Sequence, residues 1–185
     1  MKRGFTLIEL MVAITLAGLV ASIVFGSLKN AKIEAENIRV NSYVIEYAKA
    51  LMLYKSGANN FPQVNVNKSY CLGFYSATGS YKENECGLSL NPPTKNDHDL
   101  DDAIKKYLPS LPAIDTRILK ITGVINPTWL GATYSCIDDD CNQAEIIWYL
   151  GGLSKNCARP INTSIFIQEN IANGTGFTKC SITLN

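Results

Sequence analysis

An uninterrupted apolar stretch near the N-terminus constrains this chain more than any other feature. From Leu7 to Leu28 nearly every residue is apolar, whereas the rest of the 185-residue chain has the mixed composition of a soluble domain. A helix needs about 20 consecutive apolar residues to cross a bilayer, and this stretch reaches that length. Lys2 and Arg3 precede it, so the positive-inside rule predicts a cytoplasmic N-terminus and a domain on the opposite side of the membrane.

A cleavable secretory signal peptide would begin in the same way, but it would end in small residues at a cleavage site after the apolar stretch. Ala21-Ser22 resembles such a site. The apolar run continues beyond these residues, however, and passes into a helical pattern instead of a loop. The sequence therefore predicts a membrane anchor that is retained.

Glu9 places a carboxylate inside this apolar stretch. A charged side chain costs about 2.5–3.5 kcal/mol at the centre of a membrane helix and less near its end. One interpretation is an interfacial acid stabilised by the positive end of the helix dipole. The other is a carboxylate that pairs with a positive partner. In a bundle of parallel copies, a free N-terminal amine would be that partner if the chain were cut just before Phe5.

The surrounding residues, Gly4 followed by Phe5-Thr6-Leu7-Ile8-Glu9-Leu10-Met11-Val12, resemble the class III signal of type IV prepilins and pseudopilins. The resemblance implies that a prepilin peptidase cuts between Gly4 and Phe5 and methylates the new Phe5 amine. It also implies that Glu9 neutralises the amine of a neighbouring subunit during assembly. Other pilin subunits and an inner-membrane assembly platform are the further partners implied, together with a type IV pilin fold.

Hydropathy and the resemblance together divide the chain into four parts. These are a leader at 1–4, a transmembrane or filament-core half of a long helix at 5–28, an amphipathic half of that helix at 29–55, and a globular head at 56–185. The subunit is expected in the inner membrane before assembly, with its head in the periplasm. After assembly it is expected in an extracellular pilus.

The helix is predicted to continue beyond the apolar stretch with one face to bury. Apolar residues recur at spacings of three, four or seven, and charged residues occupy the other positions. Gly57 and then Pro62 predict its end, so one helix is expected from about Phe5 to about Lys55. The predicted buried face holds Ile33, Val40, Val44, Tyr47, Leu51 and Tyr54, and the predicted polar face holds Lys29, Lys32, Glu34, Glu36, Arg39, Glu46 and Lys49.

The head is predicted to carry an antiparallel sheet of about four strands laid on that buried face, which gives an α+β fold. The segment Asp99–Leu108 is typical of a short helix capped by acids and ended before Pro109. Asn162–Asn170 is ambiguous between strand and helix. Strand patterns occur at Ile118–Val124, Gly131–Cys136, Glu145–Leu150 and Thr178–Leu184, and a strand-like run lies at Tyr70–Tyr75 within a loop region from Ser56 to Pro93.

Six cysteines, all located after the apolar stretch, predict disulfides in an oxidising compartment. A metal site is the alternative, but the chain has no C-x-x-C pair, and His98 is its single histidine. Sequence alone does not choose among the connectivities. Pairing between sequence neighbours is adopted as a working hypothesis: Cys71 with Cys86, Cys136 with Cys141, and Cys157 with Cys180.

No catalytic residue, metal ligand or cofactor is predicted, because the chain shows neither a triad order nor a phosphate-cradling glycine loop. The acids at 97–101 fit helix capping better than calcium binding, since an EF-hand would need Gly at Asp102 and Glu at Leu108. The acids at 138–140 fit a solvated turn. A net charge of +1 argues against nucleic acid as a partner. A lysine patch at Lys105, Lys106 and Lys120 keeps a DNA-binding head as an alternative.

Three roles remain open for a subunit of this kind. The expectation is a minor subunit of a type IV pilus, which would serve adhesion, motility or uptake. Three disulfides favour the minor role, as does the absence of a proline before Pro62, since many major pilins carry one near the position of Gly26. A major pilin and a pseudopilin of a type II secretion system are the alternatives.

Overall fold

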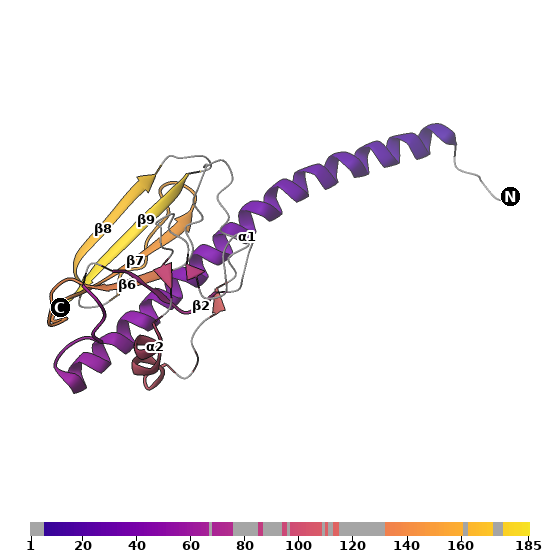
Figure 1. The fold of residues 1–185 in the computed structure, drawn as a ribbon. Helices are drawn as coiled ribbons and strands as arrows, with labels where there is room; N and C mark the ends of the chain where they lie inside the picture. Colours follow the sequence, from indigo (N-terminus) through magenta and orange to yellow (C-terminus); the bar gives the residue numbers. More distant parts are fainter. Residues whose placement is uncertain are drawn as a thin grey trace.

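One long helix and a sheet that covers half of it make up the fold (Figure 1). The computed structural model describes residues 6–66, 68–75, 85–86, 94–95, 97–108, 110, 113–114, 132–160, 163–171 and 176–185. Helix α1 (Leu7–Ala58) begins the described chain. Its first half projects away from the head, and its second half lies along the sheet (Figure 1).

Helix α1 ends later than predicted. Gly57 was expected to stop it, but this residue is helical, and the helix reaches Ala58 instead of Lys55. The stop is Asn59, which has a positive φ of 70° and donates its N–H to the carbonyl oxygen of Lys55. Asparagine tolerates this left-handed conformation better than most residues, which makes it a suitable helix terminator.

The sheet of the head has five antiparallel strands in the order β1-β6-β7-β9-β8. The predicted α+β architecture with an antiparallel sheet is therefore confirmed: β6, β7 and β9 match three of the predicted strands, and β1 and β8 form the two edges. The ambiguous segment is a strand from Thr163 onwards, and the predicted strand Ile118–Val124 lies outside the described residues. The strands are β1 (Tyr70–Leu72), β6 (Ala132–Cys136), β7 (Ala144–Gly151), β8 (Thr163–Ile171) and β9 (Phe177–Leu184).

The shorter elements complete the head. Helix α2 (His98–Lys105) ends before the predicted Leu108, and its N-cap is Asp97, whose carboxylate accepts the N–H groups of two residues in the first turn. It packs against α1, and just after its end the Tyr107 ring meets the Tyr54 ring of α1 edge to face, with ring centroids 6.4 Å apart. Two small pairs remain: β2 (Phe74–Tyr75) runs parallel to β5 (Ala113–Ile114), and β3 (Glu85–Cys86) runs antiparallel to β4 (Thr94–Lys95).

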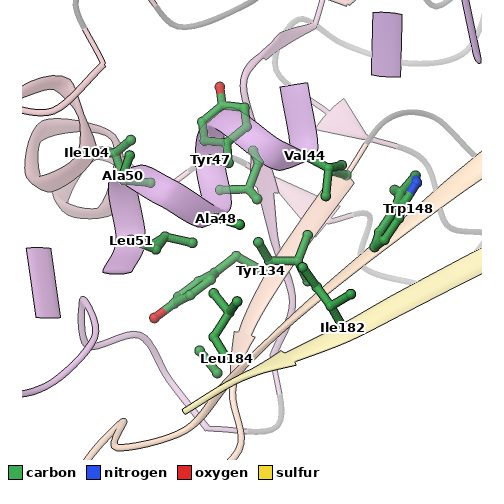
Figure 2. Packing of buried hydrophobic residues seen from close by; sticks show 14 of the residues in the cluster. Val44, Tyr47, Ala48, Ala50, Leu51, Ile104, Tyr134, Trp148, Ile182 and Leu184 are labelled. Atoms are coloured by element: carbon green, nitrogen blue, oxygen red, sulfur yellow. The ribbon is translucent and has the colours of Figure 1, made fainter. Parts of the chain in front are cut away.

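The hydrophobic core lies between the second half of α1 and the sheet. Val44, Tyr47 and Leu51 of α1 are buried, as the helical spacing predicts. They meet Tyr134, Trp148 and Ile182 from the strands (Figure 2).

The prediction for Glu36 is wrong. It was placed on the polar face, yet only 3% of it is exposed, with its carboxylate 3.7 Å from the Arg39 guanidinium. The reason is geometric, because Glu36 stands one turn before Val40 and so lies on the buried stripe.

Candidate functional site

The start of α1 is held by a reciprocal capping box. The Thr6 backbone N–H and hydroxyl both donate to Glu9 Oε2, at 2.9 and 2.7 Å, and the Glu9 backbone N–H donates to Thr6 Oγ1 at 3.4 Å. This arrangement satisfies donors that the first helical turn would leave without partners. It also fixes the side chain of Glu9 against the helix terminus, where the positive end of the helix dipole favours a carboxylate.

Among the described residues, the apolar half of α1 makes no core with the head. The large apolar side chains from Leu7 to Leu28 are 47–76% exposed. By length and composition α1 is long and apolar enough to cross a membrane, and none of its most apolar window is buried within the chain. Burial of such a surface is the main driving force of folding and association, so this half of α1 requires a lipid or protein environment that the chain itself does not supply.

Gly18 illustrates the same point. A Cβ atom added at this position would meet nothing within 4 Å. Glycine costs a helix about 1 kcal/mol relative to alanine. The chain's own packing does not require this glycine, whereas small residues let neighbouring helices approach closely in a membrane.

Two asparagines, one helical turn apart, attach α1 to the base of the head. The Asn37 amide pairs with both backbone groups of Gly151, at 2.8 and 2.9 Å. Asn41 Oδ1 accepts the indole N–H of Trp148 and the backbone N–H of Ala158, both at 3.0 Å. These side chains replace the backbone partners that the end of β7 and the following loop would otherwise lack.

An ion pair closes this junction on the solvent side. Lys155 Nζ lies 2.7 Å from Glu34 Oε2 and donates to it. The hydrogen bond from the ammonium and its positive charge hold the pKa of Glu34 below its ordinary value. Both groups are solvent-accessible, so the pair contributes little to stability by itself.

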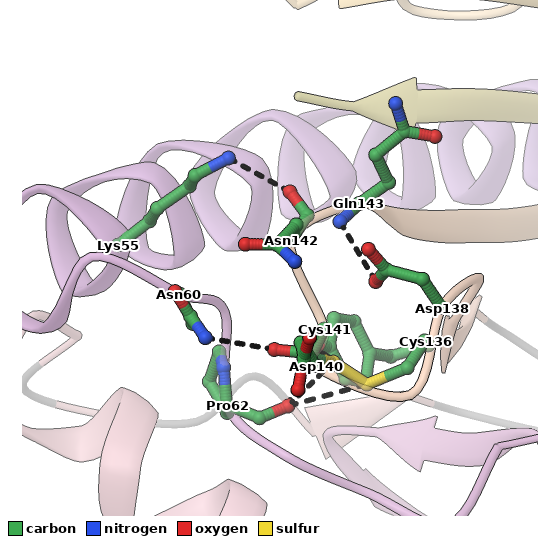
Figure 3. Close-up of a disulfide and its surroundings, with 10 residues drawn as sticks. Lys55, Asn60, Pro62, Cys136, Asp138, Asp140, Cys141, Asn142 and Gln143 are labelled. Carbon is green, nitrogen blue, oxygen red and sulfur yellow. Dashed lines mark hydrogen bonds between the residues drawn. A yellow bond between two sulfur atoms is a disulfide. The ribbon is translucent and has the colours of Figure 1, made fainter.

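The far end of the head is joined to the end of α1 around a disulfide (Figure 3). Tyr134 donates its hydroxyl to the carbonyl oxygen of Pro62 at 2.8 Å, and burial raises the Tyr134 pKa, so the hydroxyl keeps its proton. The other bonds of this junction are Phe61 N–H to Cys141 O at 3.0 Å, Asn60 Nδ2 to Asp140 O at 2.9 Å, and Lys55 Nζ to Asn142 O at 2.8 Å.

The structure joins the six cysteines as sequence neighbours, and all of them lie in the head. The pairs are Cys71–Cys86, Cys136–Cys141 and Cys157–Cys180. Cys71, Cys86, Cys141 and Cys180 are at most 1% exposed. The first pair joins β1 to β3, the second closes the β6–β7 connection, and the third ties the loop after β7 to β9.

The acids at 138–140 form the turn between β6 and β7. Asp138 accepts the backbone N–H of Gln143 at 3.2 Å. Partial desolvation raises the Asp138 pKa, but hydrogen bonds from Gln143 and Asn142 outweigh it, and the pKa is lowered on balance. Asp139 and Asp140 are exposed. Within the described ranges, no group of three His, Cys, Asp or Glu side chains is placed to hold a metal ion.

The sequence-predicted site residues are not gathered into one pocket. Glu9 lies at the start of α1, and the cysteines lie in the head, whereas Gly4 and Phe5 lie outside the described residues. Sequence reasoning missed the partnership of Thr6 with Glu9, although a threonine followed three residues later by glutamate is a capping-box pattern. It also missed Asn37 and Asn41, for which helical spacing gives no signal.

Residues 1–25 match the family model described as the prokaryotic N-terminal methylation motif. The type II secretion system core protein G of Escherichia coli (strain K12) is 36% identical over 64 residues, which cover 35% of this chain and 44% of the relative. The protein of the same name from Pectobacterium carotovorum subsp. carotovorum is 38% identical over 61 residues, covering 33% and 39%. No solved structure matches the chain significantly.

These matches confirm the resemblance of residues 4–12 to the prepilin and pseudopilin signal. The chain carries the N-terminal motif of a pilin-like protein, and part of it is similar to the core proteins of type II secretion systems. The matched segments span less than half of those relatives.

Proposed function

We propose that this chain is a structural subunit of a type II secretion pseudopilus, held in the inner membrane by α1 before it enters the filament. The observation that carries the proposal is the exposed apolar half of α1, which lies largely within the methylation motif at residues 1–25 and is not buried by the rest of the described chain. The shared name of the relatives, type II secretion system core protein G, favours a secretion pseudopilus over a surface pilus.

The geometry of α1 suits two successive environments. From Leu7 to Leu28 the helix is about 32 Å long at 1.5 Å per residue, close to the roughly 30 Å thickness of the hydrocarbon core. In the membrane this surface contacts lipid, and in the filament it contacts the same surface of other copies. Its exposed apolar face supports both, because lipid and helices bury it equally well.

Glu9 is proposed to select the register of assembly. Cleavage between Gly4 and Phe5 would place a new amine next to Thr6, at the same end of α1 as the Glu9 carboxylate. In a bundle of parallel helices, this carboxylate pairs with the amine of a neighbouring copy. The Thr6–Glu9 capping box supports this role, because it keeps the carboxylate hydrogen-bonded while the subunit is alone in the membrane.

Glu9→Ala tests this role. We expect the variant to be cut and inserted normally, yet to enter filaments poorly, because the pairing charge is gone while the apolar stretch is unchanged. Its share of cross-linked high-mass species, measured against wild type, reports incorporation. Normal incorporation of Glu9→Ala would remove the charge-pairing argument. Gly4→Ala serves as the processing control and should keep an uncut leader.

Mass spectrometry of native cells tests the proposed function as a whole. The expected result is a Phe5 N-terminus that is cut and methylated, found in the inner membrane and missing from surface filaments sheared off the cells. Deletion of the gene should then impair protein secretion. An uncut N-terminus would overturn the proposal.

A minor type IV pilin is the second candidate. Three disulfides in a head of this size favour it, because they stiffen a domain that works outside the cell. A small share of the methylated chain in sheared surface filaments, with secretion intact, would select this candidate, and a dominant share would indicate a major pilin.

A further inference from the structure

The six cysteines of the head differ in how much solvent they meet. Cys157 is half-buried, whereas each of the other five is at most 5% exposed. Its disulfide partner, Cys180, is fully buried in β9, where it stands opposite Trp148 of β7. Thiol–disulfide exchange begins when a thiolate reaches one sulfur of the bond, so its rate depends on access. Cys157 is therefore the cysteine that an external thiolate reaches most easily.

The other two disulfides are covered by their own surroundings. The Cys136–Cys141 bond lies against the segment that follows α1, and the carbonyl oxygen of Pro62 is 3.3 Å from Cys141 Sγ (Figure 3). In the Cys71–Cys86 bond, Cys71 Sγ accepts the backbone N–H of Cys86 at 3.0 Å. A thiolate would have to displace these neighbours before it could attack, so both bonds are expected to react more slowly than the half-buried one.

Cys157 lies in the loop at 152–158, which α1 holds on both sides of this cysteine. The Asn41 amide donates to the carbonyl oxygen of Asn156 at 2.8 Å and accepts the N–H of Ala158 at 3.0 Å. It thereby binds the two residues that flank Cys157. The disulfide joins the same point of the loop to β9. The loop is thus fixed between α1 and the sheet, at the place where Asn41 also accepts the indole N–H of Trp148.

We propose that Cys157 is a thiol-exchange site and that the Cys157–Cys180 disulfide is a reducible link between this loop and β9. The reactant is a dithiol. One of its thiolates attacks Cys157 Sγ, the bond to Cys180 breaks, and Cys180 leaves as a thiolate that takes up a proton. The second thiol of the reactant, deprotonated in turn, attacks the mixed disulfide and releases Cys157, which is protonated. Two electrons pass to the head, the reactant becomes a disulfide, and the reverse sequence restores the link.

Opening this link is expected to loosen the loop and to leave the sheet paired. Strand β9 keeps its backbone pairing with β7 on one side and β8 on the other. The loop is then held by hydrogen bonds, including those of Asn41 and two from Lys155. Lys155 donates its backbone N–H to Thr178 Oγ1 at 2.9 Å and its ammonium to Glu34 at 2.7 Å. Local opening of such a loop exposes its backbone to proteases. The inference concerns the head alone, so it goes beyond the proposed function and does not depend on the type of filament.

Timed alkylation of the full chain in detergent tests the exchange site. The folded chain is exposed to dithiothreitol, and samples are denatured in acid at successive times. Free thiols are blocked with light N-ethylmaleimide, and the remaining cysteines are reduced and blocked with the heavy reagent. Mass spectrometry should show Cys157 and Cys180 becoming reduced about tenfold faster than the other four cysteines. Equal rates for all six, or faster reduction of Cys136–Cys141, would overturn the proposal.

Asn41→Ala is the diagnostic variant, because it frees both neighbours of Cys157 from α1. It should raise the reduction rate of Cys157–Cys180 severalfold and leave the Cys71–Cys86 rate unchanged, which separates loop opening from unfolding of the head. Ser42→Ala is the matched control, because Ser42 is exposed and bonds to Ile38 O within the helix. Equal rates at Cys157–Cys180 in the two variants would show that Asn41 does not control access to this bond.

The source of the dithiol is tested in a second arm, with thioredoxin in place of dithiothreitol. Preferential reduction of Cys157–Cys180 by both reagents supports a protein dithiol as the reactant, and reduction by dithiothreitol alone supports a small dithiol.

Trypsin cleavage after Lys155 tests the link itself. Reduced chain should be cut at Lys155 faster than oxidised chain, and Arg159 gives no competing cut because Pro160 follows it. The double variant Cys157→Ala/Cys180→Ala should be cut as fast as reduced wild type, with or without dithiothreitol. Wild-type chain in which reduction of Cys157–Cys180 leaves cleavage at Lys155 unchanged would show that the disulfide does not hold the loop.

Discussion

The two halves of α1 form one continuous helix, yet different forces stabilise them. In the second half, Val44, Tyr47 and Leu51 are at most 1% exposed, and they pack against the sheet. In the first half, Leu16 is 59% exposed and Phe25 is 72% exposed, and the head covers neither. Both halves have the same α-helical backbone. What differs is whether the chain itself supplies the surface that buries the side chains.

This difference separates folding from assembly within a single element. A helix that is apolar all round is stable only in a membrane or in the interior of an assembly. The sheet of the same chain buries the second half of α1, whereas the first half can be buried only by lipid or by other subunits. Substitutions in the two halves should therefore change different measurements.

The largest expected effect comes from a matched pair of leucines. Leu51→Ala should lower the free energy of unfolding of the head by about 2–5 kcal/mol, because it leaves a cavity in a packed core. Leu16→Ala should change it by less than about 0.5 kcal/mol, because Leu16 makes no core contact. Denaturant unfolding of the full chain in detergent, followed by tryptophan fluorescence, measures both. Equal destabilisation by the two variants would contradict the separation.

The difference in burial between the two halves of α1 could be predicted from the sequence, because it follows from the spacing of apolar residues. Apolar spacing identified Val40, Val44, Tyr47 and Leu51 as buried, whereas Ile33 and Tyr54, predicted with them, are only half-buried. The uniformly apolar run identified the half whose large side chains stay exposed. The exact end of the helix was missed, because a left-handed Asn59 and not Gly57 terminates it. Glu36 was also misplaced, since its charge was given more weight than its position on the buried stripe.

The head was less predictable, because its contacts join residues far apart in the sequence. Asn41 accepts hydrogen bonds from residues more than 100 positions away, at Trp148 and Ala158. An asparagine on a helix carries no local sign of such partners. Glu9 shows the opposite case, since its partner Thr6 is within one turn and could have been found from the capping pattern.

A smaller effect is expected at Asn41, which attaches α1 to the base of the head. Asn41→Ala should lower the free energy of unfolding by about 1–3 kcal/mol, because the N–H groups of Trp148 and Ala158 lose their acceptor. The same fluorescence experiment measures it. Ser42→Ala is the neighbouring control and should be close to neutral, because Ser42 is exposed and bonds only within the helix, to Ile38 O. Equal effects of the two substitutions would show that the junction is not held by Asn41.

The smallest expected effect is a pH dependence of the stability of the head. It arises from the Glu34–Lys155 ion pair, which has no counterpart in the apolar half of α1. Lys155 holds the folded-state pKa of Glu34 below the ordinary value of 4.5. A carboxyl group whose pKa is lowered by folding contributes stability above its unfolded pKa and loses it as the pH falls through the folded pKa. The head should therefore lose a little stability as the pH drops below about 4.5, and Glu34→Gln should reduce that loss. Lys155→Met should do the same, because it removes the ammonium that lowers the pKa of Glu34. Identical slopes of unfolding free energy against pH in wild type and both variants would mean that the ion pair is not maintained in solution.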